Sequence, residues 1–159
     1  MKKVAIIDFK VGNIFSVVQA CKEIGLIVEV TSDYNTILSS DGVILPGVGA
    51  FGDAMKNLEE QDLIKTIKDF IETGRPFMGV CLGLQLLFSN SEEFGSYKGL
   101  GIIKGKVRKF DNSKTKVPQI GWNKIYKDLN TWENSPLEDT INDEFMYFVH
   151  SYYVEPSDG

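Results

Sequence analysis

Two side chains in this sequence have the chemistry of nucleophilic catalysis: the thiol of Cys81 and the imidazole of His150, the only histidine among 159 residues. Cysteine enzymes attack with a thiolate, and an adjacent histidine commonly serves as the base that accepts its proton. Cys81 lies in the stretch MGVCLGLQLLF, and His150 lies in YFVHSYY. The first question is therefore whether Cys81 is a nucleophile and whether His150 is its base.

The residues around Cys81 follow the pattern G-x-C-x-G, the sulfur counterpart of the G-x-S-x-G nucleophile elbow. A predicted strand, RPFMGV, leads into Cys81 and a predicted helix, LGLQLLF, follows it, which places the thiol on a sharp turn. The helix N-terminus would favour the thiolate, and the N–H of Leu82 would point at a developing oxyanion. The alternative is that Cys81 packs as a small apolar residue, the interpretation that we prefer for Cys21 on the first predicted helix.

A second glycine-rich segment, GVGAFG at residues 47–52, matches the dinucleotide fingerprint G-x-G-x-x-G. That fingerprint belongs to the first strand-to-helix turn and needs an acidic residue at the end of the next strand. Here the loop follows the third predicted strand, and the acids at that offset, Asp69 and Glu72, fall in a helical pattern. Glycine could be needed only for the turn conformation. We favour a third interpretation, in which backbone N–H groups of PGVG complete an oxyanion hole beside Cys81.

The first half of the sequence alternates strand and helix patterns. The apolar runs KVAIID, LIVEVT, GVILP and RPFMGV predict buried strands. Apolar residues at helical spacing predict a helix over residues 14–24 before Gly25, and a long amphipathic segment including residues 58–71 before Gly74. This order favours a doubly wound α/β fold, with a mostly parallel sheet covered by helices on both faces. In such sheets the site lies outside the carboxyl ends of the strands.

The second half is rich in β-branched and aromatic residues. From Gly99 onward these runs predict antiparallel strands that continue the sheet, with a polar turn at residues 111–116 and a polar loop at residues 128–143. A length of 159 residues with 43% hydrophobic content fits one domain spanning residues 1–159.

Composition excludes several classes of function. The 17 basic residues are scattered among 22 acidic ones, which argues against a nucleic-acid or anionic membrane partner. The longest apolar stretch has 12 residues, whereas a membrane span needs about 20. The first apolar run breaks at Asp8, too early for a secretory signal. Two cysteines and no sign of secretion predict a cytoplasmic protein with reduced thiols, and we expect no metal or cofactor.

Five motifs, in order, carry a resemblance to a known family: IIDFKVGNIFSV, PGVGAFGDAM, GVCLGLQLLF, PQIGWN and YFVHSYY. Together they closely resemble the class I glutamine amidotransferases, and within that family the glutaminase subunits of imidazole glycerol phosphate synthases. The resemblance runs over residues 4–154. It implies that glutamine is hydrolysed through a thioester on Cys81. It also implies a heterodimer in which ammonia passes to a (β/α)8-barrel cyclase subunit that makes imidazole glycerol phosphate in histidine biosynthesis.

The same resemblance assigns roles to individual residues. It places the oxyanion hole at the N–H groups of Leu82 and of the peptide between Val48 and Gly49. It assigns glutamine binding to Gly49, Gln85, Glu93, Ser151 and Tyr152. It assigns the partner interface and ammonia exit to Asn13, Gln119, Trp122, Asn123 and Tyr147, with packing as the alternative for Trp122. The peptide before Gly49 would have to flip to present its N–H, which would gate activity until the partner binds.

Two departures from the family pattern lie where the partner would dock. Gln119 replaces the histidine of PHMGWN, and Lys10 replaces the first glycine of DYGxGN. Both leave the glutaminase chemistry intact. They keep open an alternative in which a paralogue supplies ammonia to another barrel, for example to amidate a sugar of a surface polysaccharide.

The catalytic base is the main difference from the family. There the triad histidine and glutamate come from a later segment resembling FHPE, and no histidine follows His150 in this sequence. The sequence would then be either a truncated form or a naturally shortened, inactive scaffold. We favour truncation, because a doubly wound sheet without its last strand and helix would expose an apolar face. We predict that these 159 residues alone are inactive, and that His150 positions the strand before Ser151 and Tyr152. A deglycase-like or peptidase-like cysteine enzyme is the remaining alternative, which PGVGAF and HSYY disfavour.

Overall fold

The computed structural model describes residues 1–127, 132–133 and 135–157. Two compact units are present. The first comprises Met1–Arg108 together with the chain from Tyr153 onward, and the second comprises Lys109–Tyr152. Among the described residues, every helix is too short or too polar to cross a lipid bilayer.

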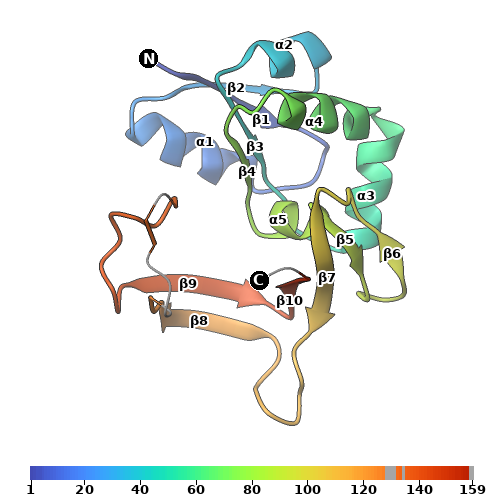
Figure 1. Cartoon of the computed structure of the whole chain (residues 1–159), viewed down its shortest axis with the longest axis vertical. Helices are drawn as coiled ribbons and strands as arrows, with labels where there is room; N and C mark the ends of the chain where they lie inside the picture. Colours follow the sequence, from blue (N-terminus) through green and yellow to red (C-terminus); the bar gives the residue numbers. More distant parts are fainter. Residues whose placement is uncertain (128–131, 134, 158–159) are drawn as a thin grey trace. The chain divides into compact units, whose positions relative to one another are not determined.

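The first unit is built on a four-stranded parallel sheet (Figure 1). Its strands are β1 (Lys3–Ile7), β2 (Ile27–Thr31), β3 (Gly42–Leu45) and β4 (Phe77–Gly79). Their order is β2-β1-β3-β4, and β1 pairs with both β2 and β3. The central strand β1 is buried from Val4 to Ile7, as expected for a strand covered on both faces. The predicted parallel sheet is confirmed.

Helices connect these strands and cover the sheet. They are α1 (Ile14–Glu23), α2 (Tyr34–Ser39), α3 (Phe51–Glu60) and α4 (Leu63–Glu72). The step from β1 to β2 runs in the opposite direction to the steps from β2 to β3 and from β3 to β4. Because such crossovers are right-handed, α1 covers one face while α2, α3 and α4 cover the other. The doubly wound α/β prediction is confirmed.

Two helical features differ from the sequence prediction. The pattern over residues 58–71 is interrupted at Asp62, whose φ of 55° ends α3 and lets α4 begin in a new direction. The helix α2 has no counterpart in the prediction, because six residues are too few to show a helical period. It begins where Asp33 accepts a hydrogen bond from Thr36 N–H at 2.8 Å. It also buries Ile37 completely.

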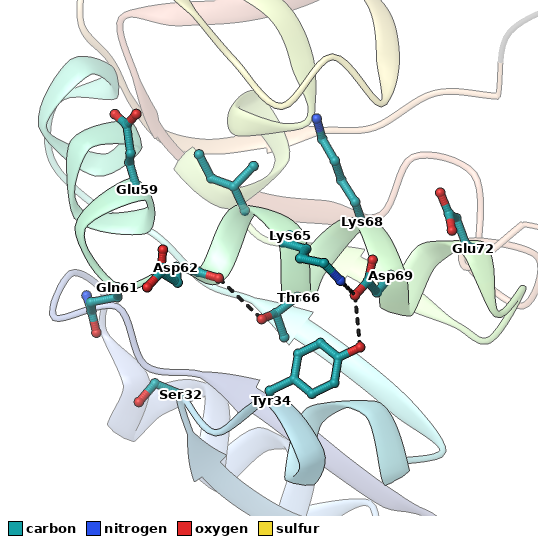
Figure 2. Close-up of a pocket in the computed structure, with 11 residues that line it drawn as sticks. Ser32, Tyr34, Glu59, Gln61, Asp62, Lys65, Thr66, Lys68, Asp69 and Glu72 are labelled. Carbon is teal, nitrogen blue, oxygen red and sulfur yellow. Dashed lines mark hydrogen bonds and ion pairs between the residues drawn. The ribbon is translucent and has the colours of Figure 1, made fainter.

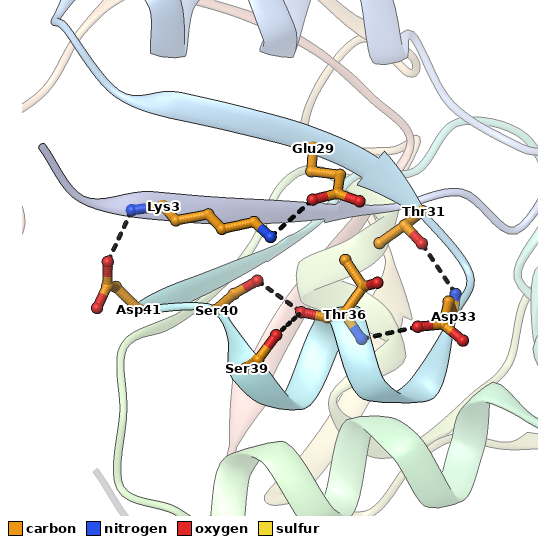
Figure 3. A network of polar contacts seen from close by, with 8 residues as sticks. All are labelled: Lys3, Glu29, Thr31, Asp33, Thr36, Ser39, Ser40 and Asp41. Atoms are coloured by element: carbon orange, nitrogen blue, oxygen red, sulfur yellow. Dashed lines mark hydrogen bonds and ion pairs between the residues drawn. The ribbon is translucent and has the colours of Figure 1, made fainter.

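Polar contacts tie α2 to its neighbours (Figure 3). Near its start, Asp33 N–H donates to the hydroxyl of Thr31 at the end of β2, and at its end the Ser40 hydroxyl donates to Thr36 O at 2.8 Å. Arg75, just before β4, donates from Nη2 to Leu38 O at 2.6 Å. These contacts satisfy backbone groups at both ends of a helix too short to be stable alone.

The remaining strands of the first unit form a second sheet, in the order β10-β7-β5-β6. Their bounds are β5 (Phe88–Ser91), β6 (Tyr97–Lys98), β7 (Ile103–Lys109) and β10 (Tyr152–Pro156), and β5 follows the short helix α5 (Leu82–Leu86). β5 pairs antiparallel with β6 but parallel with β7. The prediction that the strands after Gly99 continue the first sheet is therefore wrong, because they form separate sheets. The antiparallel prediction is wrong for the pairing of β7 with β5. A strand pattern reveals an extended segment, but its pairing partner is chosen by tertiary packing.

The second unit contains an antiparallel pair, β8 (Gln119–Lys124) and β9 (Phe145–His150). Trp122 lies opposite Tyr147, and Gln119 lies opposite His150. Here the antiparallel prediction is confirmed. Part of the polar loop predicted at residues 128–143, namely residues 128–131 and 134, lies outside the described residues.

Candidate active site

Cys81 occupies a strained turn between β4 and α5. Its φ of 55° and ψ of −117° lie outside the regions that L-residues prefer, and its side chain is exposed. Just before it, Val80 N–H donates to Leu45 O at 2.9 Å, which holds the incoming chain against β3. Backbone strain of this kind persists where the surrounding structure enforces it, often at functional sites. The sharp turn predicted from G-x-C-x-G is confirmed.

The two glycines of the motif allow α5 to approach the strands closely. A Cβ atom on Gly79 would lie 2.6 Å from Leu84 Cα, and one on Gly83 would overlap the carbonyl oxygen of Leu45. Real Cβ atoms do not come within 3.0 Å of such atoms. The spacing of the motif thus reflects contact between backbones, because a side chain at either glycine would push α5 away from β3 and β4.

Backbone donors are concentrated where α5 begins. Gly83 N–H donates to Val80 O at 3.0 Å, and the N–H groups of Leu84 and Gln85 donate to Cys81 O at 3.0 and 3.2 Å. The N–H of Leu82, the first helical residue, has no acceptor within the helix. This geometry suits the oxyanion role predicted for Leu82. Gln85 lies one turn after Cys81 on the same helix and is half-buried.

The PGVG loop lies against this turn. A Cβ atom on Gly47 would be 2.8 Å from Gly83 N and 3.0 Å from Leu82 Cβ. Gly49 has a φ of 96°, a conformation that favours glycine. The turn and oxyanion interpretations of this loop are therefore compatible with each other.

The loop after β1 also reaches this edge, since a Cβ atom on Gly12 would be 3.5 Å from the Pro46 side chain. Three loops thus meet beyond the carboxyl ends of β1, β3 and β4, where sites in such sheets form. Asp69 and Glu72 lie within α4. The dinucleotide interpretation therefore lacks the acidic strand end that it requires.

Glu93 is tied to the same region by a contact that the sequence does not reveal. Its Oε2 accepts a hydrogen bond from Phe51 N–H at 2.7 Å, although the two residues are 42 positions apart. Phe51 is the first residue of α3 and directly follows the PGVG loop and Ala50. Asn13, predicted at the partner interface, is exposed and caps α1 by accepting from Ser16 N–H at 3.3 Å.

The other predicted site residues, Gln119, Trp122, Asn123, Tyr147, Ser151 and Tyr152, belong to the second unit. Trp122 and Tyr147 form an edge-to-face pair with ring centroids 5.5 Å apart. Their exposed fractions are 68% and 54%, so Trp122 is not packed in a core in this structure. Ile120 and Val149 are also exposed. They pair with each other two residues along the strands from Trp122 and Tyr147, and therefore lie on the same face of the pair of strands.

His150 ends β9 with its ring between aromatic neighbours. The Nδ1 atom lies 2.9 Å from Tyr152 O, which makes Nδ1 the protonated nitrogen because a carbonyl oxygen only accepts. The Phe110 ring meets the imidazole edge-to-face with centroids 5.0 Å apart. A hollow of about 300 Å³ adjoins these side chains. These contacts tie the end of β9 to the turn at Ser151 and Tyr152, while the positioning role of His150 toward glutamine stays a prediction.

A larger hollow of about 730 Å³ lies along α4 and the turn before it, with Ser32 just before α2 and Tyr34 at its start also lining it (Figure 2). Tyr34 OH donates to Asp69 Oδ2 at 2.9 Å, and Lys65 pairs with the same carboxylate. Hydrogen bonds from Lys65 and Tyr34 lower the pKa of Asp69, and the bond to Asp69 raises the pKa of Tyr34. These groups satisfy one another, and none of the predicted site residues lines this hollow. The described residues also contain no cluster of three His, Cys, Asp or Glu side chains suited to a metal ion.

Comparison of this chain with known proteins identifies the family to which it belongs. The family described as "Glutamine amidotransferase class-I" matches residues 5–159. The chain therefore belongs to the class I glutamine amidotransferases. A solved structure of a glutamine amidotransferase superposes with a TM-score of 0.71 over 98% of this chain and 76% of its own, at 14% identity, and so shares the fold.

Within the family, the chain is a homologue of the imidazole glycerol phosphate synthase subunit HisH. It is 46% identical over 155 residues to HisH of Sulfurimonas denitrificans, covering 95% of this chain and 73% of that protein. It is 47% identical over 157 residues to HisH of Aquifex aeolicus, covering 98% of this chain and 74% of that protein. As the resemblance implied, these relatives extend beyond the region they share with this chain.

Proposed function

We propose that this chain is the glutaminase subunit of a synthase, hydrolysing glutamine to glutamate and ammonia through Cys81. The observation that carries the proposal is the conformation of Cys81, an exposed thiol with φ of 55° at a strand-to-helix turn. The PGVG loop packs against this turn through Gly47. The identity of 46–47% to HisH proteins supports the same assignment.

The chemistry proceeds by nucleophilic catalysis. The Cys81 thiolate adds to the side-chain amide carbon of glutamine, and the carbonyl oxygen becomes an oxyanion. The N–H groups of Leu82 and of the peptide between Val48 and Gly49 stabilise this charge. The carbon–nitrogen bond then breaks, the nitrogen takes a proton equivalent to the one that the Cys81 thiol gave up and leaves as ammonia, and a thioester remains. Water adds to the thioester and releases glutamate and the Cys81 thiol.

The loop conformation suits a gating step. Val48 and Gly49 are exposed, whereas Pro46 and Gly47 are buried, so rotation of the peptide before Gly49 disturbs little packing. Glycine at position 49 accepts both signs of φ. Partner binding would select the orientation that presents the N–H to the oxyanion, which makes glutamine hydrolysis depend on the complex.

The remaining proposed roles follow the family resemblance. Gly49, Gln85, Glu93 and the backbone of Ser151 and Tyr152 hold glutamine. The proposed partner is a (β/α)8-barrel cyclase subunit, which receives ammonia and forms imidazole glycerol phosphate in the cytoplasm.

The exposed Trp122–Tyr147 pair and the apolar residues beside it suit a protein partner, because aromatic residues are enriched at interfaces. Asn13, Gln119 and Asn123 complete the proposed interface and ammonia exit.

The test combines the complete gene product with the cyclase subunit and measures glutamate release. Cys81→Ser should abolish release, whereas Cys21→Ala, at a buried position of α1, should retain it. Release by Cys81→Ser at the wild-type rate would show that the nucleophile is another group. Formation of imidazole glycerol phosphate in the same mixture separates the histidine pathway from a paralogous acceptor.

A second measurement concerns the 159 residues by themselves. We propose that they do not turn over glutamine, because their only histidine, His150, is assigned to positioning β9. Glutamate release by this chain without further residues would overturn that assignment.

A further inference from the structure

The segment from Pro46 to Phe51 is held at both ends and exposed in the middle. At its start, Pro46 and Gly47 are buried, and Gly47 leaves no room for a Cβ atom beside Gly83 N. At its end, Phe51 is completely buried. Only Val48 and Gly49 are exposed. Any reorientation of this loop is therefore confined to its central peptide, provided that both ends stay anchored.

The anchor at the far end is a carboxylate from another part of the chain. Phe51 contributes the first N–H of α3, and the preceding residue, Ala50, has no side chain that could cap it. Glu93 supplies the missing acceptor through Oε2 at 2.7 Å. A carboxylate at a helix N-terminus forms a charge-assisted hydrogen bond and also interacts favourably with the helix dipole.

Glu93 itself projects from a supported segment. Its backbone N–H donates to the Ser91 hydroxyl at 3.2 Å, and Ser91 is buried in β5. Farther along, the Tyr97 ring of β6 lies against the start of α3, where a Cβ atom on Gly52 would be 2.7 Å from Tyr97 Cε1. The β5–β6 segment therefore holds the Glu93 carboxylate in a defined place relative to α3.

From this geometry we propose that Glu93 is a positioning residue for the oxyanion loop, in addition to any contact with glutamine. The inference rests on the function proposed above. A carboxylate has two oxygens, so Oε2 can hold Phe51 N–H while the other oxygen receives the ammonium group of glutamine. The Glu93 side chain would then both bind the substrate and hold the oxyanion loop in place. Bound glutamine would restrict the Glu93 side chain in the position from which it accepts from Phe51 N–H.

Two substitutions separate the positioning role from substrate binding. Glu93→Gln keeps an oxygen that can accept from Phe51 N–H but removes the charge that attracts the ammonium group. Glu93→Ala removes both. In the complete protein with its partner, KM for glutamine should rise about tenfold in both variants. By contrast, the kcat of Glu93→Gln should stay within about threefold of the wild-type value. The kcat of Glu93→Ala should be about tenfold lower than that of Glu93→Gln.

Asp53→Ala is the matched control. Asp53 is an exposed acid in the first turn of α3, so its removal takes a charge from the helix N-terminus but leaves the Phe51 N–H bond in place. Its kcat should equal that of wild type. A loss of kcat equal to that of Glu93→Ala would assign the effect to charge near the helix and overturn the positioning role.

Hydrogen exchange of residues 48–52 supplies a readout that does not need catalysis. The Phe51 amide should exchange faster in Glu93→Ala and at about the wild-type rate in Glu93→Gln. Equal exchange and equal kcat in the two variants would leave Glu93 with substrate binding only and overturn the proposal. If wild-type protein and partner release no glutamate, the proposed glutaminase function fails, and the exchange rates still decide whether Glu93 anchors the loop.

Discussion

Gly79 in β4 leads into the elbow, and its replacement by alanine should be costly because the space is already filled by backbone. A Cβ atom there would lie 2.6 Å from Leu84 Cα, 2.7 Å from Leu84 N and 2.8 Å from Gly83 C. Ordinary van der Waals contact begins at 3.4 Å. The helix α5 would therefore have to move by about 0.8 Å, the difference between 3.4 and 2.6 Å.

The expected loss of stability follows from this overlap. Overpacking usually costs about 1–3 kcal/mol, and the upper part of that range applies here because no flexible side chain can yield. We expect the free energy of unfolding of Gly79→Ala to fall by about 2–3 kcal/mol. For a chain of this size, that corresponds to a melting temperature lower by about 5–10 °C. Displacement of α5 should also change the rate at which iodoacetamide alkylates the Cys81 thiol.

Urea unfolding of Gly79→Ala and Gly42→Ala side by side tests the argument. Gly42 lies in the adjacent strand β3, and a Cβ atom there would meet its nearest neighbour, Pro76 O, at 3.4 Å. Gly42→Ala should therefore change the free energy of unfolding by less than about 1 kcal/mol. If Gly79→Ala is no less stable than Gly42→Ala, the close approach of α5 to β4 is not what requires glycine at position 79.

Three further predictions concern single side chains. Lys10 has a φ of 66°, so Lys10→Gly should raise the free energy of unfolding by about 0.5–1 kcal/mol, while Lys10→Ala, which keeps a Cβ atom, should not. Arg75 donates to Leu38 O at 2.6 Å, and Arg75→Lys should lower the free energy of unfolding by about 2 kcal/mol, because lysine lacks the fork of donors. The hydrogen bond from Thr36 N–H lowers the pKa of Asp33, so the carboxylate stabilises the fold fully above its unfolded pKa of about 3.9. Since that contribution is lost as pH falls through the lower folded pKa, the stability deficit of Asp33→Ala should shrink below about pH 4 in urea titrations. A deficit that stays constant down to pH 2 would contradict this linkage.

Lys10 also shows how a sequence departure acquires a structural meaning. The family resemblance expects glycine at this position, and the backbone explains why, since φ is positive and Asp8 Oδ1 accepts from Lys10 N–H at 3.0 Å in a tight turn. The Lys10 backbone adopts a left-handed conformation that costs free energy in any residue with a Cβ atom. The substitution was visible in the sequence, but its cost was not, because φ belongs to the folded backbone.

Local sequence was sufficient for features in which neighbouring residues carry the constraint. The buried β1, the helix α1 ending before Gly25 and the elbow at Cys81 were all predicted, because each depends on spacing within about ten residues. Gly25 has a φ of 79°, in agreement with its predicted capping role. The motif G-x-C-x-G likewise predicted where the strand would turn into α5.

Tertiary structure alone decided features that depend on residues far apart. The break at Asp62, the parallel pairing of β5 with β7 and the bond from Phe51 N–H to Glu93 have no signal in local periodicity. In each case the backbone has several acceptable local conformations, and distant contacts select one of them. The sequence by itself therefore determined which residue is the candidate nucleophile and the kind of turn that carries it. Only the folded chain determined which side chain holds the loop beside it, because a hydrogen bond spanning 42 residues exists only after the sheets and helices have packed.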